Sequence, residues 1–308
     1  MASKLLFTRV RTLTRLSNAF TPSNFDFPGL IQTRQYSDAL LPPPIGPAPA
    51  PSPVAAANFK RASQSSLNET ELKKFSAISE TWWDAEGPFK PLHAMNPTRL
   101  AFIRSTLCRY FRKDPNCARP FEGLKFVDVG CGGGILSEPL ARMGASVMGI
   151  DAVEKNIKIA QLHADLDPIT SSIDYRCTTA EKLVEEQRQF DAVIALEVIE
   201  HVANPSEFCK SLSELTSSSG ATIISTINRS MRAYATAIIM AEYVLHWIPR
   251  GTHEWSSFLT PEELALILQR ASITVEEMAG FVYNPVTRRW SISDDINVNF
   301  IAFGTKNR

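Results

Sequence analysis

The sequence has no excess of charge of either sign. Its 308 residues contain 32 lysines and arginines and 32 aspartates and glutamates, so the formal net charge is zero. Because nucleic-acid binding rests largely on positive charge that neutralises phosphates, this balance argues against nucleic acid as the main partner. The hydrophobic fraction of 44% is sufficient to fill the core of one large α/β domain.

Cysteine is scarce and irregularly spaced. The chain has five cysteines, an odd number, and no two of them form a C-x-x-C pair. Neither a secreted disulfide framework nor a cysteine-based zinc site is therefore indicated. This cysteine content fits a protein of a reducing compartment.

Acidic residues are almost absent from the first 37 residues, where Asp26 is the single acid. The basic residues of this stretch are Lys4, Arg9, Arg11, Arg15 and Arg34. Together with leucines spaced for one helical face, this pattern predicts a mitochondrial transit peptide at 1–36, with a disordered basic arm as the alternative. A proline- and alanine-rich stretch follows, and we place a linker at 37–66 and the folded domain at 67–308.

Apolar periodicity alternates between helical and extended patterns along the domain. Helices are predicted at 67–78, 97–111, 135–143, 155–164 and 205–215, and from Thr260 onward, with 87–93 as a loop. Strands are predicted at 125–130, 146–151, 173–177, 191–196 and 221–228, with two more near 274–279 and 298–304. Strands that are continuously apolar and separated by helices predict an α/β, Rossmann-like fold. Its mostly parallel seven-stranded sheet should carry helices on both faces.

A glycine-rich turn follows the first predicted strand in FVDVGCGGG, residues 126–134. Gly130 and Gly132 allow close approach of a ligand to the backbone, and Asp151 ends the next strand where an acid can accept hydrogen bonds from ribose hydroxyls. A dinucleotide and S-adenosylmethionine are the competing ligands. Asp128, two residues before the first glycine, favours S-adenosylmethionine, because it can face the methionine end of that ligand. A purely structural turn is the third interpretation.

Several longer motifs are more specific than the glycine turn. They are SETWWDAEGPFKPLHAMNPTRLAFI, VDVGCGGGILSEPLARMGASVMGID, ALEVIEHV, STINRS, PRGTHEW and YNP. Together they resemble the ubiquinone biosynthesis O-methyltransferases, class I S-adenosylmethionine-dependent enzymes, from about Leu67 to the C-terminus. The resemblance implies methylation of polyprenylated catechols, 3,4-dihydroxy-5-polyprenylbenzoate and demethylubiquinol. LTSSSGATI departs from the family's Lys-Pro-Gly-Gly turn, which affects only a surface turn.

The resemblance also implies roles for residues of the matching motifs. Cofactor contacts are expected from Arg99, Gly130, Asp151 and Leu196, and Mg²⁺ ligands from Glu197, Glu200 and His201. If a helix begins soon after Leu196, these three ligands share one helical face. A divalent cation on a catechol would lower the pKa of the phenol, which is about 10 in isolation. Imidazole suits Mn²⁺ or Zn²⁺ better than Mg²⁺, so His201 is either a ligand or the general base. In the structural alternative, the two glutamates lie at an exposed helix start, where the helix dipole favours negative charge, and bind no metal.

The segment 229–250 is unusually apolar for a soluble insertion. Its roughly 15 apolar residues are too few to span a bilayer, which needs about 20. Flanking arginines and the aromatic residues Tyr243 and Trp247 predict a membrane-interfacial helix that admits a polyprenyl tail. A helix packed on the domain or at a dimer contact is the alternative. We therefore expect a peripheral protein on the matrix side of the mitochondrial inner membrane, in a complex with other ubiquinone biosynthesis proteins.

Three other functions compete with this hypothesis. A methyltransferase for another small phenol would share the glycine turn. An NAD-dependent oxidoreductase would need the dinucleotide spacing, against which Asp128 argues. A noncatalytic scaffold would tolerate loss of Glu197 and Glu200, yet both are present. Trp82 and Trp83 are expected to anchor the N-terminal helix rather than to touch substrate.

Overall fold

The computed structural model describes residues 66–230 and 257–307. The predicted transit peptide at 1–36, all but the last residue of the linker at 37–66, and all but the first two residues of 229–250 lie outside this range. The described elements belong to one compact unit, Arg61–Arg308. Within the described residues, no helix is long and apolar enough to cross a membrane.

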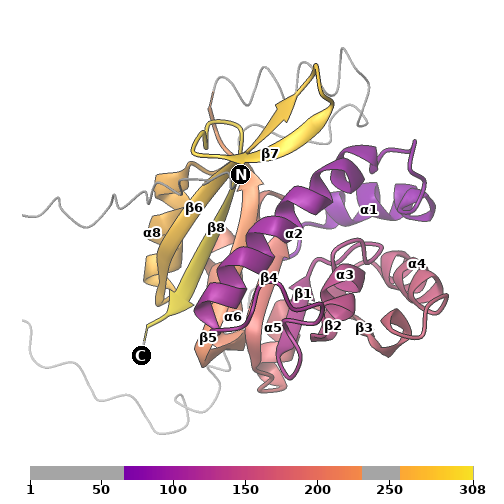
Figure 1. The fold of residues 1–308 in the computed structure, drawn as a ribbon, viewed down its shortest axis with the longest axis horizontal. Helices are drawn as coiled ribbons and strands as arrows, with labels where there is room; N and C mark the ends of the chain where they lie inside the picture. The colour runs from indigo at the N-terminus through magenta and orange to yellow at the C-terminus, as the bar shows by residue number, and fades with distance from the viewer. Residues whose placement is uncertain (1–65, 231–256, 308) are drawn as a thin grey trace, which may run out of the picture. The chain divides into compact units, whose positions relative to one another are not determined.

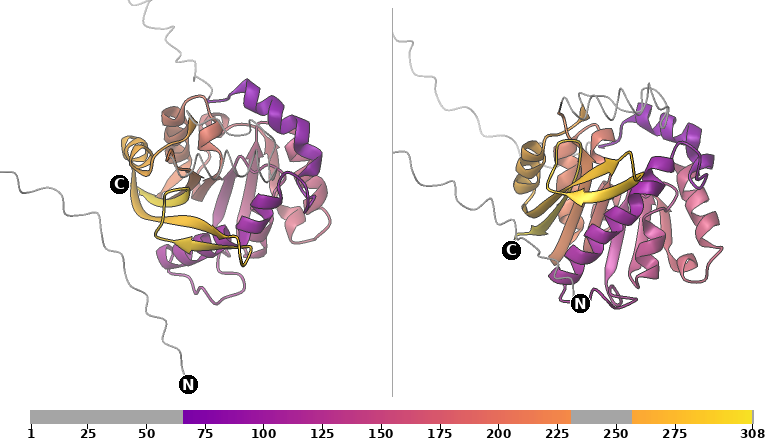
Figure 2. Two further views of the ribbon diagram at one scale, coloured as in Figure 1. Left: turned by 90° about the horizontal axis from the view of Figure 1, so that it is seen from above. Right: turned by 45° about the horizontal axis from the view of Figure 1, so that its top comes forward.

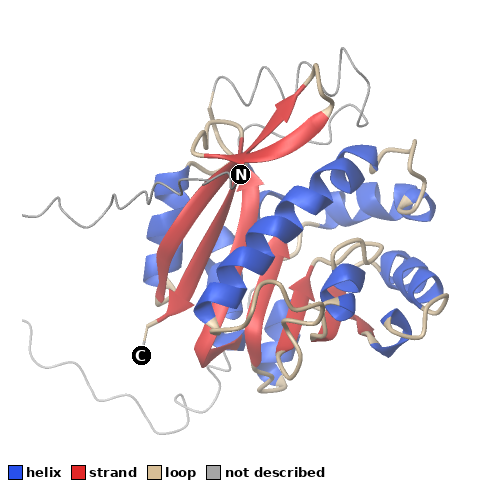
Figure 3. Cartoon of the chain, in the orientation of Figure 1, coloured by secondary structure: helices blue, strands red, loops and turns tan. Residues whose placement is uncertain are grey.

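Eight strands form one sheet in the order β3-β2-β1-β4-β5-β8-β6-β7 (Figures 1 and 3). The parallel strands are β1 (Lys125–Val129), β2 (Ser146–Asp151), β3 (Asp174–Cys177), β4 (Phe190–Leu196) and β5 (Thr216–Ile227). The strands β6 (Ile273–Asn284), β7 (Arg289–Ser293) and β8 (Asn299–Lys306) add antiparallel pairs at one side. The predicted α/β class with a mostly parallel sheet is confirmed.

The predicted number of strands, seven, is wrong, because the sheet has an eighth strand, β7, that the apolar pattern does not predict. This strand pairs with the end of β6 in a hairpin. Its residues, RWSIS, are exposed or half-buried and contain no continuous apolar run. An edge strand of this kind gives a weak sequence signal, because only one side of it pairs and neither face is fully buried.

Most helices fall close to their predicted positions, with two exceptions. They are α1 (Glu69–Ile78), α2 (Lys90–Tyr110), α3 (Ser137–Arg142), α4 (Glu154–Ala164), α5 (Ala180–Glu185), α6 (Pro205–Leu215) and α8 (Pro261–Arg270). Short 3-10 turns lie at η2 (Ser79–Thr81), η3 (Thr170–Ser172) and η4 (Ile199–His201). The exceptions are α5, which the sequence pattern does not predict, and α2, which begins at Lys90 and continues through Pro97. The predicted loop at 87–93 therefore ends at Phe89, and the predicted helix start at Pro97 is wrong. Buried side chains before and after Pro97 stabilise the helix, although proline removes one backbone hydrogen bond.

The central strands are buried on both faces, as the continuous apolar runs predicted. In β4, Ile194 packs into the core beneath α2 and α3, whereas its neighbours Val193 and Ala195 pack into the core beneath α5, α6 and α8. Successive side chains of a strand point to opposite faces, which explains this alternation. The views in Figure 2 show the helices on either side of the sheet.

The strand order reverses between β1 and β4. The chain leaves β1 towards β2 and β3, then returns to pair β4 with the other side of β1. In open parallel sheets a ligand crevice forms at such a reversal, beyond the carboxyl ends of the strands. Here those ends lead into the glycine turn, Asp151 and Glu197.

The N-terminus of α8 gives a direct test of local structure. The Thr260 hydroxyl accepts from the Glu263 amide at 3.2 Å, and the Glu263 carboxylate accepts from the Thr260 amide at 2.9 Å. Replacing a capping threonine by alanine removes the acceptor oxygen and typically costs about 1 kcal/mol. We expect Thr260→Ala to lower the free energy of unfolding by about that amount in urea denaturation. Thr287→Ala, which removes an exposed hydroxyl in the β6–β7 turn, should change it little, and equal effects would contradict the capping role.

Candidate functional site

One large cavity lies at the carboxyl ends of the central strands. Its volume is about 1060 Å³, which exceeds the usual range of roughly 300–1000 Å³ for a single small-molecule site. The cavity is lined by α1, α2, the glycine turn, the ends of β1, β2 and β4, and the β6–β7 hairpin. The structure brings every predicted site residue to this cavity: Arg99, Asp128, Gly130, Gly132, Asp151, Leu196, Glu197, Glu200 and His201.

The glycine turn is closely covered by aromatic and aliphatic side chains. A Cβ atom on Gly130 would lie 2.5 Å from Val198 Cγ2, and one on Gly132 would lie 2.4 Å from Trp82 Cη2. Gly132 also has a φ of 53°, in the left-handed region that favours glycine. Both space and backbone conformation therefore require glycine at position 132.

Asp151 is held in one orientation by three donors. Its Oδ2 accepts from the Gly132 amide at 3.1 Å, and its Oδ1 accepts from the Val153 amide at 2.8 Å and from Asn156 Nδ2 at 3.2 Å. Burial raises the pKa of this carboxyl, and the three hydrogen bonds oppose that rise. The bond to Gly132 ties the end of β2 to the glycine turn, as expected if the acid and the turn serve one ligand.

A buried cation and a buried acid lie beside the turn. Arg99 is 4% exposed, and its Nε has no hydrogen-bond partner among the described residues. Asp128 is 2% exposed and accepts from the Ser137 hydroxyl at 2.6 Å. Because a buried polar atom without a partner costs free energy, the Nε of Arg99 indicates a place for an anionic ligand group. The carboxylate of the methionine moiety fits this requirement.

The motif from Glu197 to His201 is not an α-helix, so the predicted shared helical face is wrong. Glu197 has a φ of 56°, and a 3-10 turn then covers Ile199–His201. The Glu197 amide donates to the Ser225 carbonyl at 3.1 Å, and the Ser225 hydroxyl donates to Glu197 Oε1 at 2.6 Å. These bonds to the adjacent strand β5 hold the residue in its left-handed conformation.

Glu200 is a buried acid with one unsatisfied oxygen. It is 5% exposed, its Oε2 accepts from the Thr226 hydroxyl at 2.9 Å, and its Oε1 has no partner among the described residues. Burial, and then the nearby charge of Glu197, raise the pKa of Glu200 well above its ordinary value. A cation between two such carboxylates would relieve both effects.

His201 is held from the N-terminal side of the domain. Its Nδ1 lies 2.8 Å from Glu71 Oε2, and its ring meets Phe75 edge-on at 5.0 Å. The hydrogen bond with His201 is the main reason that the pKa of Glu71 falls to about 2. Both partners lie on α1, one helical turn apart. No pattern in the sequence predicts this contact, which joins residues 130 positions apart.

The side chains of the motif supply some, but not all, of the ligands that a metal cation needs. Glu197 and Glu200 supply two carboxylates, and the unsatisfied Oε1 of Glu200 offers an acceptor. Within residues 66–230 and 257–307, however, no group of three or more His, Cys, Asp and Glu side chains is arranged to hold a metal ion. The two glutamates are therefore the residues that fit a metal, and His201 is engaged by Glu71.

Comparisons with known proteins agree on one family. Residues 98–277 match the family model described as a methyltransferase domain. The chain is 71% identical over 255 residues to the mitochondrial ubiquinone biosynthesis O-methyltransferase of Arabidopsis thaliana, covering 82% of this chain and 79% of that protein. It is 48% identical over 247 residues to the ubiquinone biosynthesis O-methyltransferase of Ruegeria sp. (strain TM1040), covering 80% and 99%. This chain belongs to the ubiquinone biosynthesis O-methyltransferases.

Solved structures support the fold of this family member. Magnesium protoporphyrin IX methyltransferase from Synechocystis PCC 6803 with bound SAH aligns with a TM-score of 0.53 at 18% identity, covering 76% of this chain and 95% of that chain. A methyltransferase from Thermotoga maritima, a possible histamine N-methyltransferase, aligns with a TM-score of 0.50 at 17% identity, covering 78% and 100%. At these identities the likeness concerns the fold alone. The resemblance seen in the motifs, the class I fold and the S-adenosylmethionine-dependent O-methyltransferase class are confirmed.

Gly132 allows the fit of the turn to be tested. Gly132→Ala should weaken binding of S-adenosylhomocysteine at least tenfold in calorimetry, because the new Cβ displaces Trp82 and strains the turn. Gly123→Ala is the matched control, since Gly123 also has a positive φ, of 83°, but nothing lies within 4 Å of its Cβ position. That variant should lose some stability and keep its affinity. Equal affinity in both variants would contradict the role of the turn.

Asp128 predicts a pH dependence of cofactor binding. Burial raises the pKa of this carboxyl from 3.8 to about 6, against the opposing effects of Ser137 and Arg99. If Asp128 contacts the ammonium of the ligand, its ionised form would attract that group, so affinity should approach its maximum well above pH 6 and be lost as pH falls through 6. Between pH 7 and pH 5 we expect S-adenosylhomocysteine to bind up to about tenfold more weakly. Asp128→Asn should remove this dependence, and an unchanged profile in the variant would contradict it.

Proposed function

We propose that this chain transfers the methyl group of S-adenosylmethionine to a ring hydroxyl of polyprenylated catechols in ubiquinone biosynthesis. The substrates are 3,4-dihydroxy-5-polyprenylbenzoate and demethylubiquinol. The observation that carries the proposal is that one cavity joins the glycine turn, the two acids Glu197 and Glu200, and an extensive apolar wall. The cofactor, a catechol and the start of a prenyl tail can then occupy adjoining parts of one cavity.

The apolar wall supports a prenylated acceptor. It is contributed by α1, α2, β6, β7 and the residues before β8, and it includes Phe75, Leu92, Met95, Phe281, Tyr283, Trp290 and Val298. An apolar lining with a few polar groups is typical of sites that hold largely apolar ligands. Polar residues of the same cavity include Glu197 and Glu200 of the EVIEH motif, as well as Arg288 and Asp295.

The residues that line the cavity have distinct tasks in the proposed reaction. Arg99 binds the methionine carboxylate and Asp128 its ammonium, which orients the sulfonium methyl group towards the acceptor. Attack by the phenol oxygen requires loss of its proton. A divalent cation, Mg²⁺ or alternatively Mn²⁺ or Zn²⁺, would be held by Glu197 and Glu200 and would lower the pKa of the catechol. His201, oriented by Glu71, completes the ligand set or accepts the proton.

The setting of the enzyme is part of the same proposal. The presequence pattern and the mitochondrial relative support a mitochondrial location. The apolar segment 229–250 supports peripheral attachment to the matrix face of the inner membrane, where a polyprenyl substrate would be found. Association with other enzymes of the pathway would allow a polyprenyl substrate that is insoluble in water to pass from one enzyme to the next.

The two glutamates can be separated from cofactor binding by mutation. Glu197→Gln and Glu200→Gln should each reduce methyl transfer to a short-prenyl dihydroxybenzoate at least 100-fold, because a carboxylate that would hold the cation is lost, and with it the positive charge that would stabilise the phenolate. Affinity for S-adenosylhomocysteine should stay within about twofold. Glu214→Gln, on the exposed face of α6, is the control and should retain activity.

In the same assay, metal removal distinguishes a cation-assisted reaction from a metal-free reaction in which His201 is the base. If a cation assists, EDTA should abolish turnover of the unmodified chain and Mg²⁺, Mn²⁺ or Zn²⁺ should restore it. Turnover that is indifferent to EDTA would reject the metal and leave His201 as the base. Equal kcat/KM for prenylated and unprenylated catechols would instead favour a methyltransferase for another small phenol.

A further inference from the structure

A buried amide near the start of α4 lies between the cofactor acid and the N-terminal segment. Asn156 is 1% exposed. Its Oδ1 accepts from the Ser79 hydroxyl at 2.8 Å and from Trp82 Nε1 at 2.9 Å, while its Nδ2 donates to Asp151 Oδ1 at 3.2 Å. A buried amide bonded at both ends fixes the relative position of the groups that it joins.

These bonds are part of a closed ring of contacts around the glycine turn. Trp82 donates to Asn156, Asn156 donates to Asp151, and Asp151 accepts from the Gly132 amide. The ring closes because the indole of Trp82 packs directly on Gly132, where an added Cβ would lie 2.4 Å from Trp82 Cη2. Moving any one of the four groups therefore disturbs the other three.

Trp82 belongs to an aromatic cover over the turn, formed by Trp82, Trp83 and Phe89. The rings of Trp82 and Phe89 stack with centroids 3.6 Å apart, and both residues line the cavity. Trp83 Nε1 donates to the Gly133 carbonyl at 2.9 Å, and its ring stacks on His163 at 3.4 Å. The cover thus touches the turn at two glycines.

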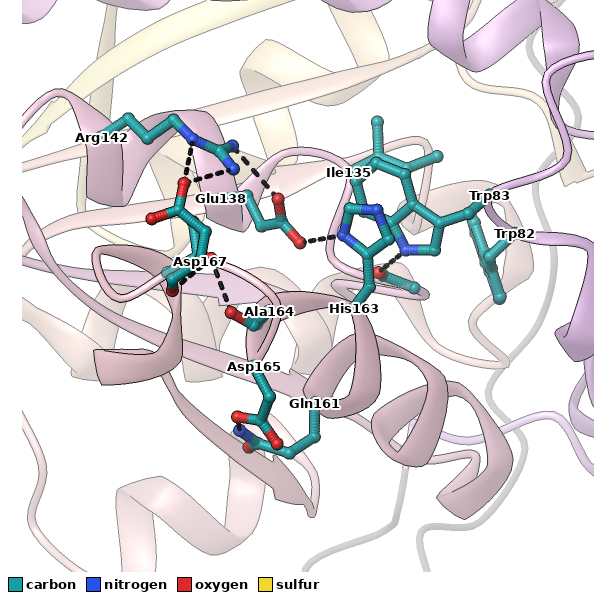
Figure 4. Close-up of polar contacts among 12 residues, drawn as sticks. Trp82, Trp83, Ile135, Glu138, Arg142, Gln161, His163, Ala164, Asp165 and Asp167 are labelled. Carbon is teal, nitrogen blue, oxygen red and sulfur yellow. Dashed lines mark hydrogen bonds and ion pairs between the residues drawn. The ribbon is translucent and has the colours of Figure 1, made fainter.

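The outer side of the cover rests on a charged cluster on α3 and α4 (Figure 4). His163 Nδ1 contacts Glu138, whose second oxygen accepts from Arg142 at 3.1 Å, and Arg142 also bonds to Asp167 at 3.1 Å. The cover is therefore anchored on its outer side independently of Asn156. Loss of Asn156 should loosen the Trp82 side of the cover without releasing Trp83.

We propose that Asn156 is a positioning residue that couples S-adenosylmethionine binding at Asp151 to docking of the aromatic cover on the glycine turn. The inference rests on the proposed function only in taking this cofactor as the ligand of the turn. Asn156 orients the acid on one side and holds Trp82 on the other, so that the crevice is preorganised for the cofactor. Removing the amide makes the cofactor order both groups when it binds.

The test measures cofactor affinity in the purified full chain. Asn156→Leu removes all three hydrogen bonds at similar volume and should weaken S-adenosylhomocysteine binding at least tenfold in calorimetry. The KM for S-adenosylmethionine should rise by a similar factor, while kcat at saturating cofactor should change less than twofold. Gln161→Leu is the control, because Gln161 lies on the same helix and bonds to Asp165 away from the cavity.

Trp82→Phe supplies a second, milder variant that keeps an aromatic ring and loses the donor to Asn156. It should weaken binding severalfold, and the double variant should bind no more weakly than Asn156→Leu alone, because both changes break the same bond. Unchanged affinity in Asn156→Leu, or effects that multiply in the double variant, would overturn the proposal. Loss of turnover with unchanged affinity would overturn it too, and would leave the methyltransferase function intact.

Discussion

The parallel pairing of β1 with both β2 and β4 is the constraint on which the site depends. Parallel strands present their carboxyl ends at one edge of the sheet, and β1 pairs in register with Ile150 of β2 and Ile194 of β4. The residues that follow these three strands are therefore brought together at the point where the strand order reverses. The glycine turn, Asp151 and Glu197 converge on one crevice for this reason, although they are separated by up to 67 positions in the chain.

Burial of charge at this edge accounts for the electrostatics of the site. Arg99, Asp128 and Glu200 are almost inaccessible to solvent, and the pKa of each carboxyl is raised because burial disfavours its charged form. The nearby charges of Glu197 and Asp128 favour the charged form of Arg99 and oppose the effect of its burial. The unpaired Nε of Arg99 and the unpaired Oε1 of Glu200 show that two buried groups of opposite charge are incompletely satisfied by the described residues. An anionic ligand group beside Arg99 and a cation beside Glu200 would satisfy these two atoms.

The N-terminal part of the domain completes this site although it precedes the residues that match the methyltransferase family model, 98–277. Ser66 donates to Glu181, Glu71 contacts His201, and Trp82 contacts Asn156. Each contact joins this segment to a residue at or beside the cavity. The common methyltransferase core thus supplies the cofactor crevice, and the segment before it orients groups that the core leaves exposed.

The sequence by itself determined the features that depend on neighbouring residues. Apolar periodicity is local, so it located the central strands and most helices, and the spacing of Asp128, Gly130, Gly132 and Asp151 indicated the cofactor. The longer motifs indicated the family, because they combine many positions at once. The same resemblance singled out Glu197, Glu200 and His201, all of which line the cavity.

The tertiary structure decided the features that depend on distant residues. Ser225, 28 positions away, holds Glu197 in a left-handed conformation, and this excludes the helix that the spacing of the motif predicted. The edge strand β7 forms because β6 is there to pair with it, and α2 continues through Pro97 because the core on either side buries its side chains. Asn156 likewise joins Asp151 to Trp82, because the fold brings Trp82 next to Asn156 although the two are 74 positions apart. Such contacts leave no periodic signal in the chain, because they are fixed by packing in space and not by separation along the sequence.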